Sequence, residues 1–141
     1  MTQGIRERRI AKTPLAVVDV ETTGLNAGAD RIVEIAVVRI DPGCAPQLVL
    51  ETLINPQRRM AATEIHGLTD ADVREAPRFI DIAGELTRVL TDCVVRAYNV
   101  YFDMKFLGYE LGQAGSLRGT FGHTRESLLS LDCGKRFMRY G

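Results

Sequence analysis

Two acidic residues at the end of a short apolar run are the first candidates for chemistry. Asp19 and Glu21 are separated by one residue and follow the sequence Leu-Ala-Val-Val at residues 15–18. This partly β-branched run lies between Pro14 and Gly24, which predicts a buried strand. Side chains two apart on a strand point to the same face of a sheet. Two carboxylates directed the same way can hold a hard divalent cation through oxygen.

The spacing alone has a simpler reading, because acidic residues two apart are also common at solvated strand ends. The position of Asp19 favours the metal interpretation. It follows four apolar residues, where a charge is costly unless it is paired or bound to a metal ion. We therefore expect Asp19 in an environment that a cation would stabilise.

The elements expected around this pair form a mixed α/β sheet. Short apolar runs bounded by turn residues predict strands, at residues 15–21, 31–40, 48–54, 93–97 and 128–133. Helical spacing of apolar residues predicts helices, at residues 70–73, 77–90, 100–111 and 134–140. Three strands with short connections favour an antiparallel meander, and the strand–helix alternation that follows places helices beside the sheet.

Apolar stripes indicate which helix faces enter the core. The helix at 77–90 has its stripe at Ile80, Ala83, Leu86, Val89 and Leu90. The helix at 100–111 has its own at Phe102, Phe106, Leu107 and Leu111. Thr69 is a candidate cap for the short helix at residues 70–73.

The composition indicates one folded domain. The chain has 141 residues, with 45% hydrophobic and 26% charged residues, and these values exclude a disordered or fibrous protein. Residues 1–13 are a basic lead-in, and the domain is expected over 14–141. A net charge of zero excludes nucleic-acid binding by bulk electrostatics alone. An acidic middle between basic ends suits a metal–carboxylate site flanked by phosphate contacts, although from charge alone we favour a solvated surface.

Cysteine usage and hydropathy bear on the compartment. Cys44, Cys93 and Cys133 are odd in number and lack the spacing of a disulfide framework or zinc site. This usage favours a reducing compartment, and we expect a cytoplasmic location. The sequence has no apolar run of about 18–20 residues, so no membrane partner is expected.

Four segments, in the same order along the chain, resemble the motifs of one enzyme superfamily. Residues 17–25, Val-Val-Asp-Val-Glu-Thr-Thr-Gly-Leu, resemble the first motif of the DEDD 3′–5′ exonucleases, which are similar to the proofreading ε subunit of bacterial DNA polymerase III. Residues 65–73 resemble its Ile-His-Gly-Leu-Thr segment, and residues 97–107 its second motif. Leu-Asp-Cys at 131–133 resembles the start of its last strand. The resemblance implies a ribonuclease-H-like, five-stranded mixed sheet flanked by helices.

The resemblance also implies a mechanism. Two divalent ions, Mg²⁺ or Mn²⁺, would support hydrolysis of the phosphodiester at a 3′ end. By motif position, Asp19, Glu21 and Asp103 would be the catalytic carboxylates and the metal ligands. For Asp103, the alternative is an acid in a helix first turn that is favoured by the helix dipole, but the flanking Asn99 and Phe102 favour the catalytic role.

Six further residues are implied as substrate contacts: Thr22, Thr23, Leu25, His66, Asn99 and Phe102. The threonines would offer donors to the terminal nucleotide, and Leu25 an apolar wedge against its base. Turn chemistry around Gly24 explains the threonines as well. His66 could equally be a turn histidine, and we favour a turn-fixing role for Asn99 over phosphate binding. Phe102 is the one aromatic on its helix that we expect near a base.

The sequence departs from the superfamily pattern in two places. Tyr98 stands where the second motif usually has His. The third motif, His-x-x-x-x-Asp, has no match, because Leu128 lies five residues after His123. The last helix is therefore expected to be truncated and the domain incomplete at its C-terminus. The superfamily's general base and fourth metal carboxylate have no counterpart in this sequence.

Three functions follow from these features. The leading hypothesis is a metal-dependent 3′–5′ exonuclease of proofreading type, which acts on single-stranded DNA ends beside a DNA polymerase subunit. The second is a catalytically incomplete member, or a fragment, that binds nucleic-acid ends or a protein. The third keeps the enzyme and changes the substrate to RNA.

Overall fold

The structure is a computed structural model that describes residues 12–59 and 67–115. Several expected features lie outside this part of the chain. They are His66, His123, most of the basic lead-in, the predicted strand at 128–133 and the predicted helix at 134–140.

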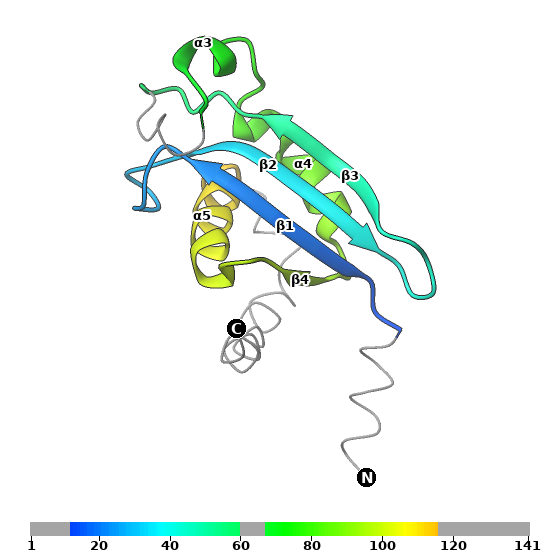
Figure 1. The fold of residues 1–141 in the computed structure, drawn as a ribbon. Coiled ribbons are helices and arrows are strands. Elements are labelled where there is room, and N and C mark those ends of the chain that lie inside the picture. Colours follow the sequence, from blue (N-terminus) through cyan, green and yellow to red (C-terminus); the bar gives the residue numbers. More distant parts are fainter. Residues whose placement is uncertain (1–11, 60–66, 116–141) are drawn as a thin grey trace.

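A four-stranded mixed sheet forms the centre of the described fold (Figure 1). Its strand order is β3-β2-β1-β4, with β1 at Leu15–Thr22, β2 at Ile32–Ile40, β3 at Gln47–Leu53 and β4 at Val94–Arg96. The first three strands pair antiparallel, which confirms the predicted meander. The fourth runs parallel to β1, as expected after a helical crossover.

The edge of β1 is only partly covered by β4. Leu15, Ala16 and Val17 pair with Val94, Val95 and Arg96, and the ladder stops there. The second half of β1, which carries both acidic residues of the first motif, extends beyond β4. The backbone groups on that edge can therefore form hydrogen bonds with an element other than β4.

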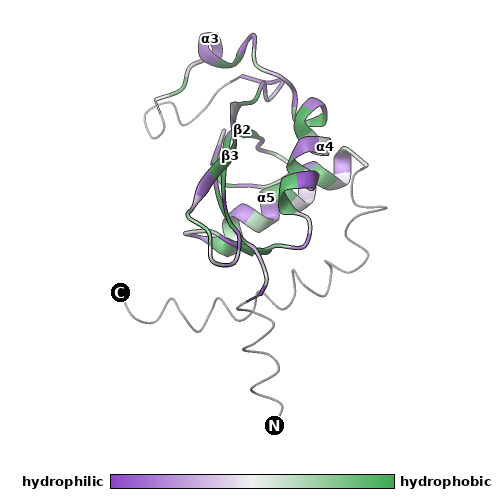
Figure 2. Ribbon diagram, turned by 90° about the vertical axis from the view of Figure 1, so that its right-hand side faces the viewer, coloured by the Kyte–Doolittle hydropathy of each residue, from purple (hydrophilic) through white to green (hydrophobic). Residues whose placement is uncertain are grey.

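Within residues 12–59 and 67–115, three helices accompany the sheet: α3 at Asp70–Val73, α4 at Phe79–Leu90 and α5 at Val100–Gln113. The two longer ones, α4 and α5, lie against the same face of the sheet (Figures 1 and 2). The predicted cap of α3 is confirmed: Thr69 is its N-cap, and its backbone N–H donates to the Asp72 carboxylate at 2.7 Å. No helix in the described ranges is long and apolar enough to cross a bilayer.

The core lies between the sheet and these two helices. Alternate residues of β1, Ala16, Val18 and Val20, are buried together with Leu86 of α4 and Phe106 of α5. The predicted stripe of α4 is wrong at one position. Ile80 is 56% exposed, and Phe79 fills the core at 3% exposure. Helix α4 begins at Phe79, and its rotation there turns that ring inward and Ile80 outward.

The opposite face of the sheet carries apolar and acidic side chains. Val17 of β1 pairs with Val38 of β2, which in turn pairs with Leu48 of β3. The exposed side chains of Val17 and Leu48 therefore share this face. Asp19 and Glu21 follow Val17 at period two and point the same way. The acidic pair therefore lies on the face away from α4 and α5.

Candidate active site

The carboxylate of Asp19 is exposed. Burial alternates along β1, with Val18 and Val20 inside and Asp19 outside. The expectation that a charge at Asp19 is costly is therefore wrong. The apolar run before Asp19 belongs to one strand, and only the even-numbered residues of that strand point into the core. Glu21 has the same orientation and is partly buried.

Asp103 is the buried carboxylate of the site. It lies in the first turn of α5, and its residue is only 4% exposed. Burial raises the pKa of Asp103 from 3.8 to about 6, and the nearby negative charge of Asp19 adds to this effect. Hydrogen bonds from backbone groups, that of Val20 first, act in the opposite direction. The fold thus brings two carboxylates that are 84 positions apart in the sequence close enough for their charges to interact.

The sequence around Asn99 explains why Asp103 reaches this place. Asn99 is the N-cap of α5, and its side-chain oxygen accepts the backbone N–H of Phe102 at 3.4 Å. This supports the turn-fixing role over phosphate binding. Because β4 ends opposite Val17, the edge of β1 at Val20 is open to the first turn of α5. The Asp103 carboxylate takes that edge position and accepts from Val20.

The donor chemistry at this point fits a divalent cation. Burial and the charge of Asp19 both penalise the ionised form of Asp103, and a cation between the two carboxylates would reverse both effects. The described residues do not, however, bring three metal ligands together. Within residues 12–59 and 67–115, no group of three His, Cys, Asp or Glu side chains is close enough to hold a metal ion.

The loop after β1 is organised around the carboxylate of Asp30. One Asp30 oxygen accepts the hydroxyl of Thr23 at 3.1 Å, and the other accepts the backbone N–H of Asn26 at 3.0 Å. Arg58 forms an ion pair with the same carboxylate at 3.5 Å. Gly24 packs directly against it, since a Cβ there would lie 2.5 Å from an Asp30 oxygen. No local sequence pattern indicates this role of Asp30.

The predicted substrate-binding threonines contribute to this loop. The hydroxyl of Thr22 donates to the Gly24 carbonyl at 2.5 Å. Thr23 is fully buried, and its hydroxyl also accepts the backbone N–H of Arg31 at 3.0 Å. Both hydroxyls thus serve turn chemistry in this structure. Substrate contact by either threonine stays a prediction.

Apolar groups suited to a nucleobase lie at two places. Leu25, at the tip of the loop, is 79% exposed, as a wedge against a base would require. Phe102 is partly buried, and its ring centroid lies 4.8 Å from that of Phe106. Tyr98, the residue that replaces the usual His, is 93% exposed. The roles of Leu25 and Phe102 toward a substrate stay predictions.

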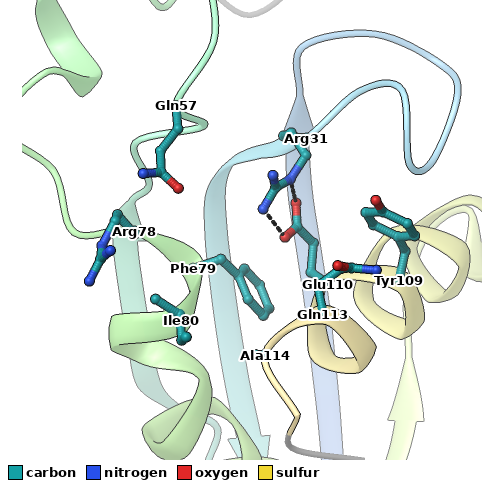
Figure 3. A pocket seen from close by; sticks show the side chains of 9 residues that line it. All are labelled: Arg31, Gln57, Arg78, Phe79, Ile80, Tyr109, Glu110, Gln113 and Ala114. Atoms are coloured by element: carbon teal, nitrogen blue, oxygen red, sulfur yellow. Dashed lines mark hydrogen bonds and ion pairs between the residues drawn. The ribbon is translucent and has the colours of Figure 1, made fainter.

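An ion pair with a buried carboxylate was missed by the sequence reasoning. Arg31, just before β2, donates to both carboxylate oxygens of Glu110 on α5. The pair lines an open pocket between α4 and α5, of about 250 Å³, next to Phe79 and Tyr109 (Figure 3). None of the three predicted catalytic carboxylates lines this pocket. The spacing of Glu110 from Asp103, seven residues on one helix, was the only available signal.

Comparison with known proteins supports the resemblance that the sequence motifs indicate. The Exonuclease family model matches residues 16–126. A DNA polymerase III subunit epsilon-like protein of Rhodobacter capsulatus is 40% identical over 110 residues, which are 72% of this chain and 16% of that protein. The DNA polymerase III subunit epsilon of Treponema pallidum is 38% identical over 96 residues, 66% of this chain and 44% of that protein. The chain thus spans less than half the length of these relatives.

Solved structures agree with the fold. The apo form of exonuclease I superposes with a TM-score of 0.62 at 19% identity, over 73% of this chain and 25% of that one. Exonuclease X in complex with 5′-overhanging duplex DNA gives 0.52 at 31% identity, over 66% of this chain and 53% of that one. These neighbours confirm the ribonuclease-H-like α/β fold, with four strands in the described part. With the family match over most of its length, the chain belongs to the exonuclease family of the DEDD superfamily.

Proposed function

We propose that this chain is a metal-dependent exonuclease domain that hydrolyses phosphodiesters at the 3′ end of DNA in proofreading. The observation that carries this proposal is the charge interaction between Asp19 and Asp103, two carboxylates that resemble the family's motif residues and lie within the matched range. The relatives named as DNA polymerase III subunits favour DNA as the substrate and a polymerase as the partner. They also favour a cytoplasmic location.

The residues have separable roles in this proposal. Asp19, Glu21 and Asp103 would hold two divalent ions, Mg²⁺ or Mn²⁺. When bound, such ions generate a nucleophilic water and neutralise charge on the phosphate. Leu25 and Phe102 would contact the terminal base, because both present apolar surface beside the motif. Thr22 and Thr23 would hold the loop that carries Leu25, and His66 would contact the terminal nucleotide.

Digestion of a labelled oligonucleotide tests the proposal. A 5′-labelled single strand should shorten stepwise in Mg²⁺ or Mn²⁺, because removal from the 3′ end leaves the label on every product. EDTA and Asp19→Ala should abolish the reaction. Glu85→Gln is the matched control, since Glu85 is an exposed acid on α4 and its removal should leave the rate unchanged. Equal activity of Asp19→Ala and the wild-type chain would contradict the site assignment.

A matched RNA strand decides the substrate. Faster digestion of DNA than of RNA is expected, and the reverse preference would move the proposal to RNA. Release of the 5′ label in the first products would contradict the 3′–5′ direction.

A second function is favoured by one observation. The described residues do not bring three metal ligands together, which agrees with a catalytically incomplete domain that binds nucleic-acid ends or a protein. Tight binding of a 3′ end by the folded chain, without turnover in either metal, would support this function. Robust turnover would exclude it.

A further inference from the structure

The ion pair between Arg31 and Glu110 joins two distant parts of the chain. The Nε and Nη2 atoms of Arg31 lie 2.6 and 2.7 Å from the two carboxylate oxygens of Glu110. Glu110 is 2% exposed, whereas the Arg31 side chain is 30% exposed toward the pocket (Figure 3). One Glu110 oxygen also accepts the backbone N–H of Ile32, at 3.4 Å. This carboxylate therefore holds α5 against the start of β2.

The same helix face carries Asp103. Asp103, Leu107 and Glu110 are all buried, and their spacing of four and seven residues places them on one side of α5. Asp103 and Glu110 are about 10 Å apart along the helix axis, from a rise of 1.5 Å per residue. The helix is thus fixed to the sheet at two points. One is Asp103 on the Val20 backbone, and the other is Glu110 on Arg31.

Arg31 is also bound to the motif loop. Its backbone N–H donates to the Thr23 hydroxyl at 3.0 Å, and its carbonyl accepts the Thr23 N–H at 2.9 Å. The side chain and the backbone of one residue therefore connect α5, which bears Asp103, to the segment that follows Glu21. A rotation of α5 that moved Asp103 would have to break the contact of Arg31 with Glu110.

We propose that Arg31 and Glu110 are positioning residues for the exonuclease reaction, which set the rotation and depth of α5 so that Asp103 meets Asp19. This inference rests on the function proposed above. A guanidinium bound through two nitrogens fixes both the distance and the orientation of its partner, which a single contact does not. The pocket beside the pair leaves Arg31 open on one side, so at this end of the helix the ion pair adds a directional contact to the core packing of Leu107 and Leu111.

Three variants separate positioning from folding. Arg31→Lys keeps the charge and loses the two-pronged geometry. Glu110→Gln keeps the shape and loses the charge. Arg31→Met with Glu110→Gln leaves no unpaired buried charge and keeps an acceptor for the Ile32 N–H, so this double variant should fold even where a single one does not. Glu85→Gln, in an exposed ion pair on α4, is the control.

We expect kcat to fall roughly 10- to 100-fold in the folded variants while KM changes less than about threefold, because misplacement by about 1 Å has effects of this size. The Mn²⁺ concentration for half-maximal rate should rise in parallel. A role in folding alone would lower the folded fraction and leave kcat per folded molecule unchanged. Unchanged kcat in folded Arg31→Lys and in the double variant overturns the proposal.

The backbone amide resonance of Val20 gives a readout that does not need activity, because this N–H donates to Asp103. It should shift in Arg31→Lys and in the double variant but not in Glu85→Gln. If the wild-type chain does not cleave DNA, the function proposed above fails. The resonance still decides this inference: a shift supports the positioning of Asp103 by the ion pair, and no shift overturns it.

Discussion

At the scale of single residues, the site depends on one carboxyl group whose burial opposes its charge. Asp103 is shielded from water and lies beside Asp19, so its pKa is raised to about 6. A structural acid at a helix N-terminus would gain from the helix dipole and from solvent. The environment of Asp103 instead disfavours its ionised form, and strongly shifted pKa values of this kind are typical of residues at functional sites.

The unfavourable ionisation of buried Asp103 should make the effect of Asp103→Asn on the free energy of unfolding depend on pH. Below pH 4 the carboxyl is protonated in both the folded and the unfolded chain, so the substitution should change stability little. Between pH 4 and 6 the unfolded chain releases its proton while the folded chain retains it, and the wild-type protein loses stability as pH rises. The change in pKa from 3.8 to about 6 corresponds to roughly 3 kcal/mol. Asp103→Asn should be more stable than wild type by up to that amount above pH 6.

Urea unfolding in EDTA between pH 4 and 8 measures this difference. Glu85→Gln provides the control, since its exposed ion pair contributes under about 1 kcal/mol and should show no such pH profile. A stability difference for Asp103→Asn that is constant with pH, or a destabilised variant at pH 7.5, would contradict the raised pKa.

At the scale of elements, the loop between β1 and β2 is held by a set of polar contacts around one carboxylate. The Asp30 carboxylate accepts bonds from Thr23 and Asn26 and pairs with Arg58. Gly24 gives this carboxylate the room it occupies. The exposed position of Leu25 therefore depends on a residue five positions further along the chain.

Gly24→Ala should disrupt this loop. The new Cβ would lie 2.5 Å from an Asp30 oxygen, so the carboxylate and its partners must move. We expect a loss of about 1–3 kcal/mol in the free energy of unfolding, the range for overpacked sites. Gly84→Ala is the matched control: nothing lies within 4 Å of its Cβ on α4, and alanine should stabilise the helix by about 0.5–1 kcal/mol. Equal effects of the two substitutions in thermal or urea unfolding would contradict this account of the loop.

The elements differ in how far the sequence predicts them. Strand β1 and helix α5 follow from local patterns, because burial alternates along one and apolar residues recur at helical spacing in the other. The extent of α4 was predicted well, but not its rotation: Phe79 and Ile80 are both apolar, and only packing against the sheet decides which is buried. Arg31 and Glu110 are 79 residues apart in the sequence, and the periodicity of apolar residues within one element cannot indicate such a contact. The burial of Asp103 depends in the same way on the short length of β4.

At the scale of the whole molecule, the site joins halves of the chain that meet only in the folded state. Asp19 belongs to the meander, and Asp103 belongs to the helix that follows β4. A cation bound between them would bind the folded chain and not the unfolded one. Metal binding should therefore appear as added stability of the whole domain, independently of any turnover.

Mn²⁺ should raise the melting temperature of the wild-type chain at pH 7.5, and EDTA should reverse the change. An ion present at 100 times its Kd adds about 2.7 kcal/mol, enough for a shift of several degrees in a domain of this size. The shift should be lost in Asp19→Ala and in Asp103→Asn and kept in Glu85→Gln. It should also shrink as pH falls through 6, because Asp103 must release its proton to bind the ion. An equal shift in Asp19→Ala, or one that does not change between pH 5 and 8, would place the metal elsewhere in the chain and separate the two carboxylates from the chemistry proposed for them.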